Sequence, residues 1–298
     1  MFRRTIPLAS PLALAQTLAA LRLGQSDPTM VLSPTRALMA TRTPDGPATV
    51  DVQHYDEVLE VEAWGDGAEW ALAQAPAALG VLDDAAGFHP SHPAVRQLHE
   101  AASGLRLPRT ALVFDAVLSA LLRHQATPFE ARRSFQQLVE RWGEPAPGPG
   151  GLRLRPDAHG LAALGEYELH AAGVEAQRAD ALKRASAHAS RIEAAAVLPG
   201  PEMRAALELI PGITAWTAAE AARVAAGDSD AIDLGDPAQR KLIGHTLRGG
   251  PEPSEEQVHE LLEEFRGQRG RVCVLIEWAA LSSPLGLGEP RTSFPAPH

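Results

Sequence analysis

Four residues, Pro211-Gly212-Ile213-Thr214, separate two segments with helical sequences, residues 201–210 and 215–226. Pro211 has no backbone N–H to donate and Gly212 can adopt positive φ, so together they end the first helix. Thr214 has the side chain of an N-cap for the second helix. The chain must reverse within these four residues, which constrains the fold more than any other local feature. The two segments are therefore predicted to form an αα-hairpin.

So short a reversal leaves backbone amides of the hairpin and of the second helix unpaired and pointing outward. Such amides at a helix N-terminus form an anion site, and DNA phosphate is a natural occupant. Helical hairpins are also common in bundles that bind no nucleic acid. The hairpin alone leaves phosphate binding and simple helix packing as alternatives.

The rest of the chain predicts an α+β fold, with a small mixed domain over residues 1–92. We expect a short strand at residues 2–6 and a helix over 12–23 that Ser10-Pro11 begins. Alternating apolar residues on both sides of a Pro-Asp-Gly turn at 44–46 predict an antiparallel meander. A helix follows the meander, and Pro76 must end or bend it.

From Pro93 onward the apolar spacing and the stop signals predict one helix after another. The predicted helices are residues 94–102, 111–123, 128–141, 157–164, 166–171, 175–196, 201–210, 215–226, 237–247, 254–266 and 269–281. The most apolar of them contains Ala111–Leu122 and is expected to be a buried central helix, since it is too short to span a bilayer. Gly143–Pro156 is a proline- and glycine-rich excursion, and residues 284–298 are expected to form a loose tail.

The charge distribution restricts how the protein can bind nucleic acid. The formal net charge is −10, and only the middle third is net positive, with 12 basic and 10 acidic side chains over residues 101–198. A DNA-binding face must therefore be a local basic patch. One cysteine, Cys273, excludes an internal disulfide and cysteine-based zinc or iron–sulfur sites. The first residues have no secretory signal pattern, so we expect a cytoplasmic, nucleoid-associated protein without membrane contact.

Asp236 opens the last group of helices. Asp236-Pro237-Ala238-Gln239 has the pattern of an N-cap, a first-turn proline and a glutamine at N3. The aspartate could simply start this helix. The helix amides would, however, also keep its carboxylate ionised, and an ionised carboxylate can stabilise a sugar that becomes an oxocarbenium cation.

The segment with the hairpin and this aspartate, "LIPGITAWTAAEAARVAAGDSDAIDLGDPAQRKLIG", resembles the helix-hairpin-helix–Gly/Pro-rich–Asp signature of DNA glycosylases. The matching positions are Ile210, Pro211, Gly212, Ile213, Thr217, Ala218 and, at the catalytic aspartate, Asp236. Thr214 stands where the family has a second glycine. Residues 112–144, residues 265–281 and the mixed N-terminal domain also resemble the AlkA-type 3-methyladenine DNA glycosylases.

This resemblance implies a helical glycosylase region over residues 93–283, with two helical subdomains flanking a lesion cleft. Trp216 occupies the position of the catalytic lysine in bifunctional members, and neither Lys183 nor Lys241 fits that position. The resemblance therefore implies a monofunctional enzyme. It places the base pocket at Trp216 and Trp278 and the wedge that fills the gap of the flipped base at Gln125.

The resemblance further implies a phosphate-binding hairpin at Pro211, Gly212, Ile213, Thr214 and Thr217. Additional phosphate contacts are expected from Arg123, His124, Arg240 and Lys241. No organic cofactor or metal site is expected, apart from a monovalent cation at the hairpin carbonyls. The partner would be double-stranded DNA with a damaged base, and the protein is expected to be a monomer.

The predicted activity is hydrolysis of the N-glycosidic bond of alkylated purines, with Asp236 stabilising the sugar cation. Three alternatives stay open at the level of the sequence. The first is excision of another damaged purine, such as hypoxanthine or an oxidised purine. The second is a non-catalytic DNA-structure-binding protein on the same fold. Thr214, which would be strained if its position required positive φ, the small residues Pro237-Ala238 after Asp236 and the acidic net charge favour this alternative. The third is a helical interaction protein without a nucleic-acid role.

Overall fold

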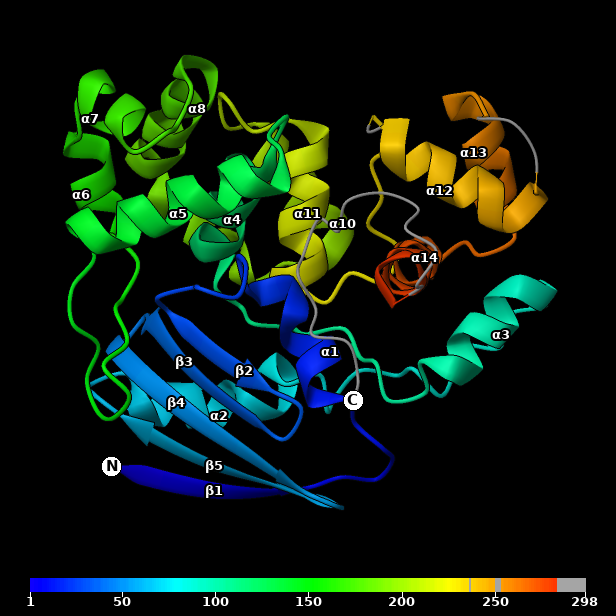
Figure 1. The fold of residues 1–298 in the computed structure, drawn as a ribbon, viewed down its shortest axis with the longest axis horizontal. Coiled ribbons are helices and arrows are strands. Elements are labelled where there is room, and N and C mark those ends of the chain that lie inside the picture. Colours follow the sequence, from blue (N-terminus) through cyan, green and yellow to red (C-terminus); the bar gives the residue numbers. More distant parts are fainter. Residues whose placement is uncertain (236, 250–252, 283–298) are drawn as a thin grey trace.

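The computed structural model describes residues 1–235, 237–249 and 253–282. It has a five-stranded sheet at one end and two groups of helices above and beside it (Figure 1). This is the α+β architecture that the sequence predicts, with the strands confined to the N-terminal part of the chain.

The sheet is antiparallel throughout, with the strand order β1-β5-β4-β3-β2. Its strands are β1 (Phe2–Pro7), β2 (Met30–Ser33), β3 (Arg36–Thr43), β4 (Gly46–Tyr55) and β5 (Val58–Trp64). The predicted turn before Gly46 joins β3 to β4 and confirms the meander. Helices α1 (Leu14–Leu18) and α2 (Ala68–Ala78) share an apolar core with the sheet, because the inward residues of both layers are aliphatic.

One local prediction in this domain needs correction. The first helix begins at Leu14, after Ala13, and a 3-10 turn (Ala19–Leu21) completes it; Ser10 is not its N-cap. The Ser10 hydroxyl accepts a hydrogen bond from Arg106 Nη2 (3.0 Å) instead, so a long-range contact holds it away from the helix. Pro76 lies in the last turn of α2, which ends two residues later at Ala78.

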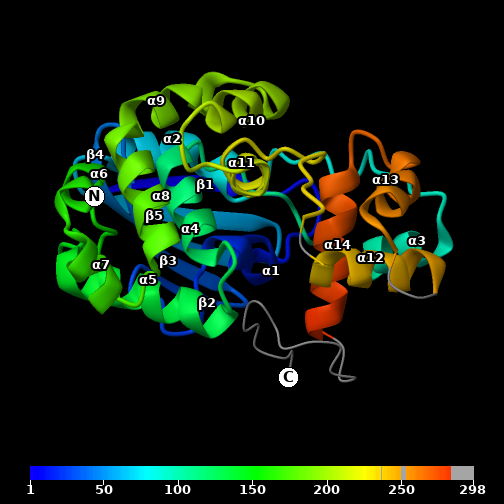
Figure 2. The ribbon, with the colours of Figure 1, turned by 90° about the horizontal axis from the view of Figure 1, so that it is seen from above.

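The larger helical group surrounds α4 (Val113–Arg123), in which nine of eleven residues are buried. The helices around it are α5 (Pro128–Trp142), α6 (Ala158–Ala163), α7 (Glu166–Ala171), α8 (Ala176–Ala187), α9 (Ala189–Glu193), α10 (Gly200–Glu208) and α11 (Ala215–Ala225). Figure 2 shows α4 from above, between α8 and α11. The amides of Val113 and Phe114 donate to the Glu193 carboxylate (3.2 and 3.0 Å), which caps α4 from α9. The predicted buried central helix is confirmed.

The helix predicted over residues 175–196 is divided. His188 has φ −108° and ψ 17° and separates α8 from α9, and a 3-10 turn (Ala194–Val197) follows. The His188 ring nitrogen Nδ1 lies 2.9 Å from the carbonyl oxygen of Arg184, so the side chain competes with the backbone for that acceptor.

The smaller helical group has a separate apolar core. It contains α3 (Pro93–Ala101), α12 (Pro237–Arg248), α13 (Glu255–Glu263) and α14 (Arg269–Ser282). This group therefore combines one helix that precedes α4 in the sequence with three helices that follow α11. Residues 284–298, predicted to be a loose tail, lie outside the described residues.

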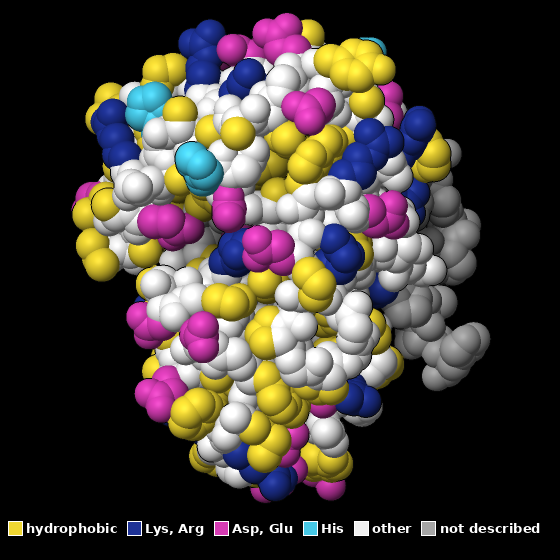
Figure 3. All heavy atoms as spheres, turned by 90° about the vertical axis from the view of Figure 1, so that its left-hand side faces the viewer, with side chains coloured by type: hydrophobic (Ala, Val, Ile, Leu, Met, Phe, Trp, Pro, Cys, Tyr) yellow, Lys and Arg dark blue, Asp and Glu magenta, His cyan; other side chains and the backbone are white. Residues whose placement is uncertain are grey.

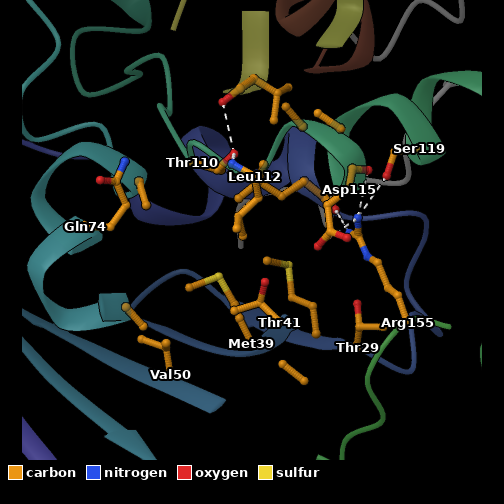
Figure 4. Close-up of a pocket in the computed structure, with 18 of the residues that line it drawn as sticks. Thr29, Met39, Thr41, Val50, Gln74, Thr110, Leu112, Asp115, Ser119 and Arg155 are labelled. Carbon is orange, nitrogen blue, oxygen red and sulfur yellow. Dashed lines mark hydrogen bonds and ion pairs between the residues drawn. The ribbon is translucent and has the colours of Figure 1, made fainter. Parts of the chain in front are cut away.

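An apolar contact and a pocket lie between the sheet and the larger helical group. Leu152 and Leu154, in the Gly143–Pro156 excursion, pack against Leu38 and Ala40 of β3. A pocket of about 110 Å³ lies between the sheet and α4 (Figure 4). Most of its lining is apolar, and neither Trp216 nor Trp278 belongs to it.

The described part of the chain contains no helix with both the length and the apolar character needed to cross a membrane. On the face formed by the sheet edge and the helices α5 to α8, acidic and basic side chains are interspersed (Figure 3).

The burial of α4 predicts a strong dependence of stability on its apolar side chains. Leu118 is 1% exposed, and Leu118→Ala should lower the free energy of unfolding by about 2–5 kcal/mol, because it removes packed atoms and leaves a cavity. The same change at Leu82, which is 62% exposed, should cost no more than about 0.5 kcal/mol. Equilibrium denaturation measures both values, and equal losses would contradict the central position of α4.

Candidate functional site

The hairpin predicted from the Pro-Gly break is present. Helix α10 ends at Glu208 and α11 begins at Ala215, and Ile210 and Ile213 between them are buried against the larger core. Pro211, Gly212 and Thr214 are exposed. The apolar residues therefore hold the turn in place while its backbone faces outward.

Gly212 has a conformation that requires glycine. Its φ is +93°, and a Cβ at this position would lie 3.0 Å from the Cα of Ala181 in α8. L-residues rarely adopt this φ, and a Cβ would contact α8 so closely that the helix would have to shift. The reversal is thus fixed both by its own backbone and by contact with the helix beneath it.

Thr214 has the extended conformation of an N-cap, with φ −86° and ψ 166°. Its hydroxyl oxygen accepts a hydrogen bond from the amide of Thr217 (3.2 Å). A glycine is not needed at this position, because its φ is negative. The replacement of the second glycine by threonine therefore introduces no backbone strain and supplies a cap.

The amides of the hairpin are only partly used within the chain. That of Ile213 donates to the carbonyl of Ile210 (3.1 Å), and that of Thr217 is taken by the cap. Across the described residues, no protein acceptor contacts the amides of Gly212, Thr214, Ala215 or Trp216. This turn and the first turn of α11 can therefore donate hydrogen bonds to an anion such as a phosphate group.

Trp216, in the first turn of α11, packs beside His124, which follows α4. Their ring centroids are 5.3 Å apart and the ring planes are inclined by 46°. Burial lowers the pKa of His124, and the opposing attraction of Asp233 is smaller. The lowered pKa favours the neutral form of His124, and its ring forms an aromatic pair with Trp216. The phosphate contact predicted for His124 stays a prediction.

Gln125 is exposed and has φ +49°, an uncommon conformation for a residue other than glycine. The end of α4 lies on one side of it. On the other side, Thr127 and Glu130 form a capping box that starts α5. A glutamine with an uncommon backbone conformation therefore lies at the surface between two helix ends, and its role as a wedge stays a prediction.

The basic residues predicted to contact phosphate have different surroundings. Arg123 lies inward, and its Nη1 is 3.4 Å from a carboxylate oxygen of Glu220. Arg240 donates to the carbonyl oxygen of Leu234, and Lys241 is exposed. Lys241 is therefore the one of these three whose side chain lies fully at the surface.

The other two predicted site residues lie in or beside the smaller helical group. Trp278 is partly buried and packs against the core of that group. Asp236, the predicted catalytic residue, lies outside the described residues; Pro237, the next residue, is the first of α12. The structure therefore brings Trp216 together with His124, whereas Trp278 belongs to the opposite helical group.

A cluster of charged side chains beside this site was not predicted from the sequence. Arg223 of α11 contacts Glu220 (Nη2 to Oε2, 2.8 Å) and Glu277 of α14 (Nη1 to Oε2, 3.6 Å). Gln239 of α12 donates from Nε2 to Glu277 Oε1 (2.9 Å). The one available signal was the presence of Glu220 and Arg223, three residues apart, among the alanines of a buried helix.

No group of three histidine, cysteine, aspartate or glutamate side chains within the described ranges is arranged to hold a metal ion. Burial raises the pKa of the Cys273 thiol, which is fully enclosed in the smaller core. This cysteine is therefore a packing residue, not a nucleophile.

Comparison of the whole fold with known proteins gives consistent results. No protein-family model and no curated protein sequence matches the chain. Three similar solved structures are a 3-methyladenine DNA glycosylase from Archaeoglobus fulgidus, an 8-oxoguanine glycosylase/lyase from Clostridium acetobutylicum and the 3-methyladenine DNA glycosylase Mag1 from Schizosaccharomyces pombe.

The archaeal structure has a TM-score of 0.78 at 18% identity and covers 96% of this chain and 100% of its own. The clostridial structure has a TM-score of 0.62 at 13% identity and covers 83% of this chain and 97% of its own. The yeast structure, solved with abasic DNA, has a TM-score of 0.53 at 18% identity and covers 66% of this chain and 94% of its own. The chain therefore has the fold of the helix-hairpin-helix DNA glycosylases, as its resemblance to that family predicts.

The geometry of Gly212 predicts a specific cost for a side chain there. Gly212→Ala should destabilise the protein by at least about 1 kcal/mol more than Gly151→Ala, because an added Cβ meets Ala181 only in the first case. Gly151 is a matched control, since its φ is also positive (+63°) and nothing lies within 4 Å of an added Cβ. Denaturation of both variants tests this, and equal losses would mean that α8 does not support the hairpin.

Proposed function

We propose that the protein is a monofunctional DNA glycosylase that hydrolyses the N-glycosidic bond of alkylated purines of the 3-methyladenine type. The main support is the hairpin, whose unused amides face outward directly before the aromatic pair of Trp216 and His124. The amides can hold a DNA phosphate while the adjacent aromatic surface receives a base turned out of the helix. The names of the archaeal and yeast structures, both 3-methyladenine DNA glycosylases, support the same substrate class.

In this proposal Asp236 supplies the chemistry. In the sequence it directly precedes Pro237, the first residue of α12, and a carboxylate at a helix N-terminus would be favoured in its ionised form by the helix dipole. An ionised carboxylate can stabilise the oxocarbenium-like sugar as the base leaves and can guide the attacking water. A cationic alkylated purine is already a good leaving group, so the enzyme needs little acid catalysis.

His124 has a different role in this proposal from the one that the sequence predicts. Because its pKa is lowered, it is neutral at physiological pH and does not repel a cationic base. With Trp216 it would form an aromatic wall, and aromatic faces attract cations. Gln125 would fill the gap that the flipped base leaves, and Lys241 would contact a phosphate. We further propose that the protein is a monomer and that the hairpin carbonyls bind a monovalent cation.

One observation favours the non-catalytic alternative. Arg123 and Arg240 contact Glu220 and Leu234, so two of the cations expected to meet phosphate already have partners within the protein. This reduces the positive charge available to DNA and would suit a weak binder of DNA structure. The strain that positive φ would cause at Thr214, one of the sequence arguments for that alternative, is absent, because its φ is −86°.

The proposal predicts separate effects on stability and activity for Asp236→Asn. Asparagine caps a helix about as well as aspartate, so the free energy of unfolding should change by no more than about 1 kcal/mol. Loss of the charge should lower the excision rate by about 10²–10³-fold for a neutral base such as hypoxanthine and by less for cationic 3-methyladenine. Single-turnover assays on duplexes with one lesion measure this, and near-normal excision of the neutral base would refute the assignment.

Trp216 at the lysine position predicts that the reaction stops at the abasic site. Borohydride added during turnover should trap no covalent protein–DNA adduct, because no amine forms a Schiff base with the sugar. A bifunctional glycosylase/lyase treated in parallel serves as the positive control. An adduct that forms in proportion to activity would show that the enzyme also has lyase chemistry.

A further inference from the structure

The charged cluster of Arg223, Glu220, Glu277 and Gln239 joins helices that belong to different apolar cores. Arg223 and Glu220 are on α11 in the larger group, whereas Glu277 and Gln239 are on α14 and α12 in the smaller group. The hairpin and Trp216 begin α11, and Asp236 precedes α12. The cluster therefore connects the two helices that carry the proposed binding and catalytic parts.

The contacts form a continuous chain from the wedge segment to the start of α12. Arg123, two residues before Gln125, contacts Glu220 (3.4 Å), which also contacts Arg223 (2.8 Å). Arg223 contacts Glu277 (3.6 Å), and Glu277 accepts from Gln239 (2.9 Å). Gln239 is the third residue of α12, so this chain ends in the first turn of the helix that Asp236 precedes.

The burial of the cluster makes its geometry rigid and its pairing obligatory. The side chains of Arg223 and Glu220 are only 10% and 14% exposed, and that of Glu277 is 34% exposed. Burial disfavours the charged form of Arg223, but attraction by Glu220 and Glu277 outweighs it and raises the pKa of the guanidinium. Removing one partner would leave a buried charge uncompensated, which is far more costly than losing a surface pair.

General stability alone does not account for this arrangement. Each group of helices already has its own apolar core, and a buried ion pair is often no more stabilising than apolar residues of the same size. Directional contacts, in contrast, fix register and orientation between elements. A cluster at this place is therefore better suited to setting the position of α12 against α11 than to holding either group together.

We propose that Glu277 and Gln239 are positioning residues, which fix the first turn of α12 against the hairpin helix α11; in the proposed function Asp236 directly precedes that turn in the sequence. This inference rests on the proposed glycosylase function. A displacement of about 1 Å in a catalytic group can cost about 10²-fold in rate, so a contact at N3 of the helix is close enough to control the reaction. Binding of lesion DNA depends on the hairpin and Trp216 and should not depend on this contact.

The test exchanges the two side chains that form the link. Gln239→Glu places a second carboxylate against Glu277, and the single-turnover rate for hypoxanthine should fall by about 10- to 100-fold with the Kd for lesion DNA unchanged within about twofold. Adding Glu277→Gln restores the hydrogen bond with donor and acceptor exchanged. The double variant should recover at least half of the loss in the logarithm of the single-turnover rate. Gln257→Glu is the matched control, since Gln257 is also the third residue of a helix (α13), and its rate should not change.

Epistasis with Asp236 separates positioning from a structural role. In an Asp236→Asn background, Gln239→Glu should lower the remaining rate by no more than about twofold, because the group that it displaces is already inactive. Denaturation of each variant checks that the protein is folded. A full additional loss in that background, or no rescue by Glu277→Gln, would overturn the inference while leaving the glycosylase proposal intact. Absence of excision by the wild-type protein on every lesion would overturn both.

Discussion

The reversal at Pro211-Gly212 is the constraint on which the rest of the site depends. Gly212 has φ +93°, and a Cβ there would lie only 3.0 Å from the Cα of Ala181 in α8, so this turn between α10 and α11 favours glycine on two grounds. The turn leaves the hairpin amides exposed while burying Ile210 and Ile213. It also sets the direction of α11, and thereby places Trp216 beside His124 and Arg223 towards α14. The backbone conformation of one turn thus affects three parts of the proposed site. These are the hairpin amides, the aromatic pair and the contact of α11 with the opposite helical group.

The two helical groups are joined by polar contacts, in contrast to the apolar packing within each. Asp230, in the segment after α11, accepts from the amide of Gly267 (2.8 Å) and from Arg269 Nε (2.8 Å) at the start of α14. The Arg223 cluster joins α11 itself to α14 and α12. Directional contacts of this kind fix orientation without requiring a continuous core. Such a junction allows the surface between the groups to be used for a ligand, as the proposed function requires.

Much of the fold follows from local sequence signals, because the chain has strong ones. Proline, glycine and capping residues mark the ends of most helices, so predicted limits such as 166–171 agree with the structure. The failures have nonlocal causes. Ser10 is bound by Arg106, almost a hundred residues away, and the ring of His188 takes a carbonyl from its own helix. In the site, the hairpin could be predicted from four residues. The His124–Trp216 pair and the Arg223 cluster could not, because they depend on how separate helices pack, and the spacing of residues in the sequence does not specify this.

The central claim is that this hairpin fold removes a damaged base from DNA. The most direct measurement uses duplexes that each contain one defined lesion, namely 3-methyladenine, hypoxanthine or 8-oxoguanine, together with an undamaged duplex. Released base is quantified by chromatography, and abasic sites are quantified by strand cleavage in alkali. The account predicts release of 3-methyladenine in equal amounts with alkali-sensitive sites, and intact strands without alkali. Release of no base from any duplex, by a folded protein that still binds DNA, would contradict it.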